Sequence, residues 1–187
     1  MALTKVRTGG ITADAVDNTI LDLADDFAFT GTVSGTITTL NSGGLSLSGN
    51  TEADIFNLPS GIKRIIINFR GVSVSSSDNL QVQLGTSSGL TGSGYASISH
   101  YGSGGISVTS GFGLYGVNNT NILSGIMTIA HMGSNIYVSS HSAKYNTSNG
   151  VFGGGDVSLS GTLDRLRIRP TGSNTFDAGS LNIFYEL

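Results

Sequence analysis

The sequence predicts an all-β protein, a jelly-roll-like β-sandwich, on three observations. In residues 163–169 three arginines alternate with leucine and isoleucine, which is typical of a strand with one solvated and one buried face. Residues 181–187 alternate in the same way. Charged residues make up only 11% of the chain, and Gly, Ser, Thr and Asn cover the surface instead. That mixture disfavours helices, because these residues compete for backbone hydrogen bonds or lose much entropy on ordering.

The chain divides near residue 50 into an extended N-terminal arm (1–50) and a sandwich domain (51–187). Within residues 13–26 apolar side chains recur at helical spacing, which predicts a short helix. Residues 29–49 combine small residues with regularly placed Val and Leu, and two interpretations compete. The segment is either a flexible linker or an extended shaft whose apolar side chains contact symmetry mates in a homotrimer. The regular spacing favours the shaft.

About eight or nine short strands with turn signals between them are predicted in residues 51–187. The strand at 62–69 is β-branched and largely apolar, so we expect both of its faces to be covered. Gly133-Ser134 predicts a tight hairpin, and Asn149-Gly150 marks another turn. In chain order the candidate segments for these strands are 55–58, 62–69, 79–84, 95–99, 112–115, 122–132, 135–140, 157–159, 163–169 and 181–187.

Charge and composition exclude several classes of protein. The net charge of −3 provides no basic face for nucleic acid, and the lack of cysteine excludes disulfides and thiol chemistry. No apolar run approaches the ~18 residues of a membrane span, and no hydrophobic signal segment follows Met1. We therefore expect a soluble protein that is synthesised in a cytoplasm.

No catalytic or metal-binding constellation is predicted, and no cofactor is expected. Residues 85–89 match the G-x-S-x-G string of hydrolases, but the glycines and serines that follow do not predict the helix that a nucleophile elbow requires. His100, His131 and His141 lack the spacing of a zinc site. The few carboxylates lie mostly beside Gly, Ser or Asn, where capping of turns is their ordinary use. The sequence predicts a protein that is not an enzyme.

With catalysis excluded, binding of a surface ligand is the remaining function, and aromatic residues between about 90 and 150 are the candidate binding residues. Aromatic rings stack on sugars, and loops on a rigid scaffold present them well. The alternative is that these rings pack between protomers or against the sandwich edge. Two N-x-[ST] sequons, at Asn118 and Asn146, carry no meaning without a secretory signal. The candidate ligand-binding residues are Tyr95, His100, Tyr101, Tyr115, Tyr137, His141 and Tyr145.

Three parts of the sandwich sequence carry recognisable motifs. They are LPSGIKRI at 58–65 with FRGVS at 69–73, QLG at 83–85 with TGSGYAS at 91–97, and SGTLDRLRI at 160–168 with FDAGSLNI at 176–183 and Tyr185-Glu186. These parts resemble the C-terminal β-sandwich domains of bacteriophage fibre-type virion proteins. The N-terminal segments 10–20 and 29–35 resemble attachment regions of fibre proteins from phages of aquatic bacteria.

The resemblance implies a homotrimeric virion protein, a tail fibre or fibre-like appendage. Its arm would bind other virion proteins, and its sandwich would contribute to host adsorption by binding a cell-surface glycan. The first alternative is a capsid decoration, head fibre or structural tail component without receptor binding. A free carbohydrate-binding module, clipped from a larger enzyme, is a third interpretation, which the Met1 start and the ending inside a strand disfavour.

Overall fold

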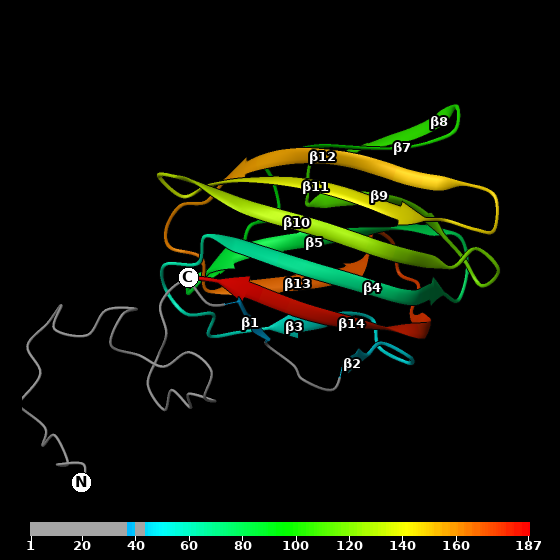
Figure 1. The fold of residues 1–187 in the computed structure, drawn as a ribbon, viewed down its shortest axis with the longest axis horizontal. Helices are drawn as coiled ribbons and strands as arrows, with labels where there is room; N and C mark the ends of the chain where they lie inside the picture. Colours follow the sequence, from blue (N-terminus) through cyan, green and yellow to red (C-terminus); the bar gives the residue numbers. More distant parts are fainter. Residues whose placement is uncertain (1–36, 40–43) are drawn as a thin grey trace, which may run out of the picture. The chain divides into compact units, whose positions relative to one another are not determined.

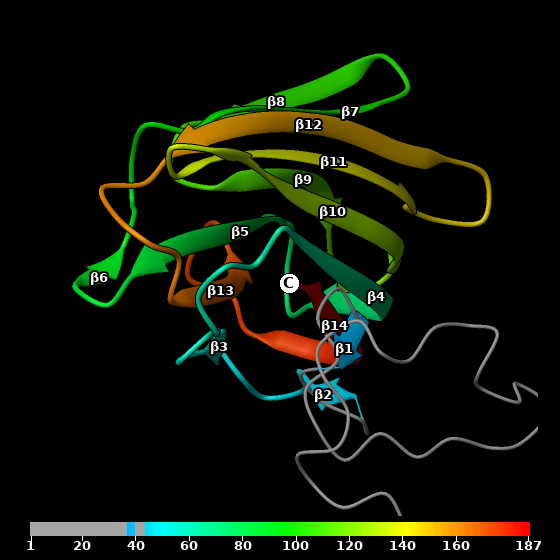
Figure 2. The same cartoon turned by 60° about the vertical axis from the view of Figure 1, so that its left-hand side comes forward.

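The computed structural model describes residues 37–39 and 44–187. All regular secondary structure in this part of the chain is β-strand. The strands form two antiparallel sheets that pack as a sandwich, confirming the predicted all-β class. Among the same residues no helix exists that is long and apolar enough to cross a membrane. Figure 1 shows the large sheet in front of the small one, and Figure 2 shows the two layers from another side.

The large sheet has nine strands, and eight of them follow one another across it. The ninth, β2 (Leu45–Ser46), pairs with the same strand as β1, the strand β14, so these two short strands lie along one edge. In spatial order the eight are β1 (Ile37–Thr39), β14 (Phe176–Glu186), β4 (Arg64–Val74), β10 (Leu123–Gly133), β11 (Ile136–Lys144), β12 (Gly150–Ser158), β7 (Ala96–Tyr101) and β8 (Gly104–Val108).

The small sheet has five strands and is centred on β5. One edge of β5 pairs with β13, and its other edge pairs first with β9 and then with β6. Strand β9 also contacts β7 and β12 of the large sheet, so it lies between the layers on that side. The strands are β3 (Ala53–Ile55), β5 (Asp78–Thr86), β6 (Gly89–Leu90), β9 (Phe112–Val117) and β13 (Arg165–Pro170).

The hydrophobic core fills the space between the sheets, because alternate residues of each strand point inward. Strand β13 follows the predicted pattern, with Leu166 and Ile168 fully buried beside half-exposed arginines. The largest fully buried side chains are Phe112, Phe176, Leu47, Ile65, Ile67, Leu80, Leu84, Leu114, Leu123, Met127, Ile129 and Leu166.

The structure corrects several expectations about individual segments. Leu47 is fully buried and Leu45 packs against the same core. These two side chains are therefore covered by their own chain and not by a symmetry mate, as the predicted shaft would require. The strand at 62–69 is not fully covered on both faces: Ile67 is buried, whereas Ile66 on the other face is only partly buried. Strand β12 begins at Gly150, well before the predicted 157.

Other expectations fall outside the described residues. The predicted helix at 13–26 and the first part of the predicted shaft lie there. Residues from 35 onward belong to one compact unit with the sandwich, so the sheet includes strands that precede the predicted boundary at residue 50.

The two ends of the sandwich differ. At the entry end, Ile37 pairs with Glu186, which pairs in turn with Arg64. At the loop end, the segments 118–122 and 145–149 lie side by side, because they flank the antiparallel pair β10 and β11 and Ser124 pairs with Lys144. The loop end is on the right in Figure 1, and the entry end is on the left beside the C-terminus.

Candidate functional site

Three of the seven candidate residues meet at the loop end, where they form a cluster of tyrosine rings. Tyr101 ends β7, Tyr115 lies in β9, and Tyr145 directly follows β11. The Tyr101 ring lies 5.5 Å from that of Tyr115, nearly parallel to it, and 4.7 Å from that of Tyr145. The Tyr115 and Tyr145 rings are 6.2 Å apart. All three are only partly buried, so this cluster keeps aromatic surface in contact with solvent.

Glycines beside the cluster make room for the rings. A Cβ atom on Gly104 would lie 3.3 Å from the Tyr115 hydroxyl, and one on Gly116 would lie 3.2 Å from the Tyr145 ring. Gly116 also has a φ of +50°, a conformation that other residues rarely adopt. The glycine-rich composition around the cluster is therefore a condition for packing three tyrosines together.

Tyr145 links the cluster to the neighbouring loop. Its hydroxyl oxygen accepts a hydrogen bond of 3.1 Å from the side-chain amide of Asn121. Burial, and then the nearby Tyr115 and Tyr101, raise the pKa of Tyr145, so its phenol stays neutral at physiological pH. A neutral phenol keeps a proton that it can donate to a ligand oxygen.

The two loops at this end share the pattern N-x-[ST]-N, and the same kind of hydrogen bond closes each of them. The side-chain oxygen of Asn118 accepts hydrogen bonds from the backbone N–H groups of Thr120 and Asn121, at 2.9 and 2.7 Å. Asn146 likewise accepts from the N–H groups of residues 148 and 149, each at 2.9 Å. Such side-chain-to-backbone turns fix a loop without a hydrophobic core. Sequence reasoning dismissed both segments as sequons, although this pattern is the signal that could have identified them.

Two surface hollows border the cluster and are lined mainly by hydroxyl and amide groups. One, of about 380 Å³, lies between the two N-x-[ST]-N loops and includes Lys144. The other, of about 500 Å³, has Tyr115 and Tyr145 in its wall together with Asp78 and Asn79. The Asp78 carboxylate already accepts hydrogen bonds from the segment 171–174. Its charge is thus largely engaged within the protein.

His100 lies apart from the tyrosine cluster. It precedes Tyr101 in β7 and so points to the opposite face of the strand. Its ring stacks at 6.3 Å on Phe152, an exposed residue on the outer face of the large sheet.

The three remaining candidates are buried, which corrects the expectation that they lie on accessible loops. Tyr95 packs edge-on against Phe112 at 5.1 Å, and the backbone N–H of Leu84 donates a 2.7 Å hydrogen bond to its hydroxyl oxygen. Burial raises the pKa of Tyr95 to about 12. Tyr137 is also buried, which raises its pKa, and its ring stacks on His131 at 4.9 Å.

His141 forms a buried pair with Ser99. Its Nε2 lies 3.0 Å from the Ser99 hydroxyl oxygen, which also accepts a 3.0 Å hydrogen bond from the backbone N–H of Tyr115. Burial lowers the pKa of His141 to about 4, so the imidazole is neutral near neutral pH. Ser99 is fully buried, and a substrate cannot reach it. The pair connects β7, β9 and β11 and has a structural role.

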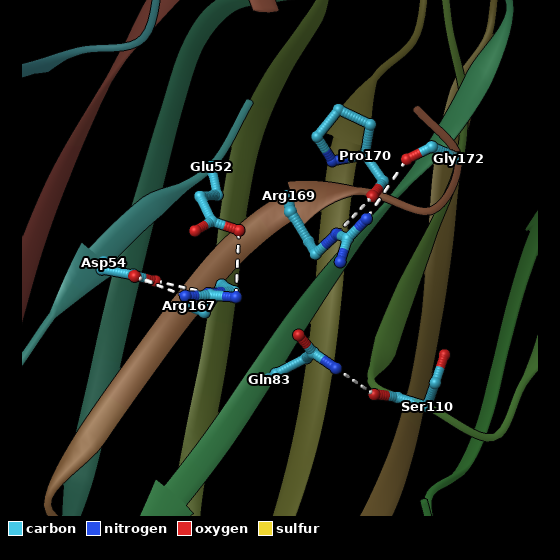
Figure 3. Close-up of polar contacts among 8 residues, drawn as sticks. All are labelled: Glu52, Asp54, Gln83, Ser110, Arg167, Arg169, Pro170 and Gly172. Carbon is cyan, nitrogen blue, oxygen red and sulfur yellow. Dashed lines mark hydrogen bonds and ion pairs between the residues drawn. The ribbon is translucent and has the colours of Figure 1, made fainter. Parts of the chain in front are cut away.

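The arginines of β13 form no free basic patch, and Figure 3 shows the partners of Arg167 and Arg169. Arg167 donates two hydrogen bonds of 2.6 Å to Asp54 and forms a 2.9 Å ion pair with Glu52. Arg165 pairs with the adjacent aspartate at 3.1 Å. Arg169 donates to two backbone carbonyls, at 3.0 and 3.2 Å. These cations are satisfied within the chain, which leaves the small sheet without an anion site built from them.

The G-x-S-x-G string at 85–89 forms the hairpin between β5 and β6 and not a strand-to-helix turn. Among the residues that the structure describes, no group of three His, Cys, Asp or Glu side chains is placed to hold a metal ion. No family model, curated protein or solved structure shows a significant match to this chain.

Proposed function

We propose that this chain is a non-enzymatic virion protein of the fibre type, and that its loop end binds a glycan on the host surface. The observation that carries the proposal is the cluster of Tyr101, Tyr115 and Tyr145 bordered by two polar hollows. The virion assignment comes from the sequence resemblance to phage fibre proteins.

The chemistry of the loop end suits a carbohydrate. The apolar C–H face of a sugar ring packs on aromatic rings, and its hydroxyls need several donors and acceptors. Asn, Ser and Thr side chains in the hollow between the loops supply both. The hollows contain few charges, and the carboxylate among them is engaged internally. A neutral glycan fits this surface better than a polyanion.

The position of the site supports the same function. The described chain begins at the entry end, where Ile37 pairs with Glu186, and the tyrosine cluster lies at the opposite end of the sheet. A sandwich attached to a particle through residues before 37 would direct its loop end away from that attachment. The arm binding other virion proteins, and the homotrimer, are parts of this proposal.

The test is to screen the full recombinant chain on an array of bacterial surface glycans and compare variants. Tyr101→Ala and Tyr145→Ala should each weaken binding several-fold, since one aromatic contact contributes on the order of 1 kcal/mol. The control is Phe56→Ala, a more exposed aromatic residue that is 52% exposed and lies beside Arg165 of the small sheet. No binding by the wild type, or unchanged binding by the folded tyrosine variants, would contradict the proposal.

A capsid decoration or structural tail component is the second candidate. Five of the seven exposed large apolar side chains among the described residues belong to strands of the large sheet, as expected for contact with another protein. If this function is the correct one, virions carrying the tyrosine variants adsorb normally, and virions lacking this protein fall apart on heating or dilution.

A further inference from the structure

The outer face of the large sheet carries an apolar surface that the described part of the chain does not cover. Ile98, Ile126 and Phe152 are 49%, 51% and 58% exposed, and each has at least one buried neighbour in its strand. Ile66 and Phe184, which are partly buried, add a smaller apolar area on β4 and β14. Figure 1 is viewed onto this face. Exposed apolar side chains gathered on one face of a sheet are typical of a contact with another molecule.

Two flanks of this face have complementary shapes. The first flank is β14 with β4, and the second is β12 with β7. The strand register places Ile66, Gly154 and Ile98 in one row across the sheet, through Thr128 and Ser140. Phe184 extends that row at the first flank. In this row the first flank carries two large side chains, Phe184 and Ile66. The second flank carries Gly154 beside Ile98.

The charges of the two flanks are complementary as well. Arg64 on β4 and Asp156 on β12 are both exposed, and they occupy one row through Ala130 and Val138. Arg64 also forms a 3.3 Å ion pair with Glu186, which leaves half of its side chain exposed. Within one chain two strands separate Arg64 from Asp156, so they can meet only in different copies.

We propose that a second copy of this chain covers this face. The β14–β4 flank of one copy packs on the β12–β7 flank of the next, about a rotation axis parallel to the strands. Residues of the same row then meet: Arg64 faces Asp156, and Ile66 packs over Gly154. Sheets that pack face to face keep their strands within about 30° of one another, which this arrangement satisfies. Closed rotational symmetry of this type is usual for homo-oligomers.

The orientation has a structural consequence. Because the axis is parallel to the strands, the residue that opens the described chain, Ile37, lies at the same end of every copy, and the tyrosine clusters lie together at the other. The contact is independent of glycan binding, since it uses none of the residues at the loop end. It also differs from the predicted association through the arm, so truncation of residues 1–36 should leave it in place.

The first experiment measures self-association of the full chain by sedimentation velocity over a micromolar concentration range. Ile98→Asp should raise the concentration for half-assembly by about tenfold or more, because it places a charge in the apolar contact. Phe56→Asp is the matched control, equally exposed on the other sheet, and should assemble like the wild type. Circular dichroism verifies the fold of each. A monomeric wild type, or equal effects of the two variants, would overturn the proposal.

The second experiment tests the orientation with cysteines, which the natural chain lacks. In the double variant Arg64→Cys/Asp156→Cys, a disulfide within one chain is impossible. The strands are about 14 Å apart, whereas bridged Cα atoms lie within about 7 Å. Mild oxidation should therefore give covalent oligomers, and the largest closed species reports the number of copies. Arg70→Cys/Asp156→Cys should remain uncrosslinked, because Arg70 lies about 20 Å from Arg64 along β4 and so occupies a different row from Asp156. Crosslinking of this control in place of the test variant would refute the parallel contact.

Discussion

Substitution of His141 by glutamine should remove part of the acid sensitivity of the fold. The imidazole is buried between the sheets, and its pKa is lowered from 6.5 to about 4. Below the unfolded pKa of 6.5, the unfolded chain binds a proton that the folded chain resists. The stability that His141 contributes is therefore complete above pH 6.5 and is lost as the pH falls toward 4.

The size of the effect follows from the two pKa values. One pKa unit corresponds to about 1.4 kcal/mol, so the wild type should lose roughly 2.5 kcal/mol through His141 between about pH 7.5 and pH 4.5. The glutamine side chain of the variant does not titrate but retains a polar group near Ser99. Carboxylates also titrate in this range, yet they are the same in both proteins, so the difference between them isolates the histidine.

Urea unfolding of both proteins at the two pH values provides the measurement. The variant should start less stable at the higher pH, because its amide fits the space between Ser99 and Gly153 imperfectly, and it should lose less on acidification. Equal losses in the two proteins would show that His141 is accessible to water and protons in the folded state. The buried pair with Ser99 would then be the wrong description.

Three further outcomes are expected. Ile67→Asp should prevent folding, since an unpaired buried charge costs several kcal/mol against a domain stability of about 5–15 kcal/mol, whereas Ile66→Asp on the outer face should fold, as judged by circular dichroism. Asp54→Asn should lower the free energy of unfolding by about 2 kcal/mol by weakening the two hydrogen bonds from Arg167, measured by urea unfolding. Asn146→Ala should leave the melting temperature almost unchanged but speed amide exchange at residues 148 and 149, because it removes the acceptor of their N–H groups.

Alternating segments were predictable from sequence, and glycine-rich ones were not. Strand β13 has inward and outward positions that can be read directly from Leu166 and Ile168. Strand β12 contains three consecutive glycines, so no alternation marks most of its length. Glycine is required at these positions because of a segment distant in the sequence. A Cβ atom on Gly153 would lie 2.2 Å from the carbonyl oxygen of Ile98, and one on Gly155 would lie 2.4 Å from that of Ala96. The close approach of β7 requires glycine there, and sequence alone does not state which strand approaches.

The aromatic residues show a similar limit. Tyr95 and Tyr101 precede and end the same short strand, in equally glycine-rich surroundings, yet the first is buried and the second borders solvent. Composition near a residue does not distinguish these outcomes, because they depend on which residue of the opposite sheet lies against each ring. Tyr95 packs against Phe112, a fully buried residue of β9, whereas Tyr101 stacks on Tyr115, a partly exposed residue of the same strand.

The loop end, by contrast, was within reach of sequence reasoning. A hairpin at residues 133–134 implies that the segments before β10 and after β11 lie side by side, whatever the rest of the fold. Those segments are the two N-x-[ST]-N loops. In the structure Ser124 pairs with Lys144, so the two loops do lie side by side. An asparagine that caps its own loop needs no distant partner, so the pattern is a local signal. Combining these two local rules places two polar loops together, with Tyr145 beside them. Only Tyr101 of β7 and Tyr115 of β9 could not be placed at this end without the structure.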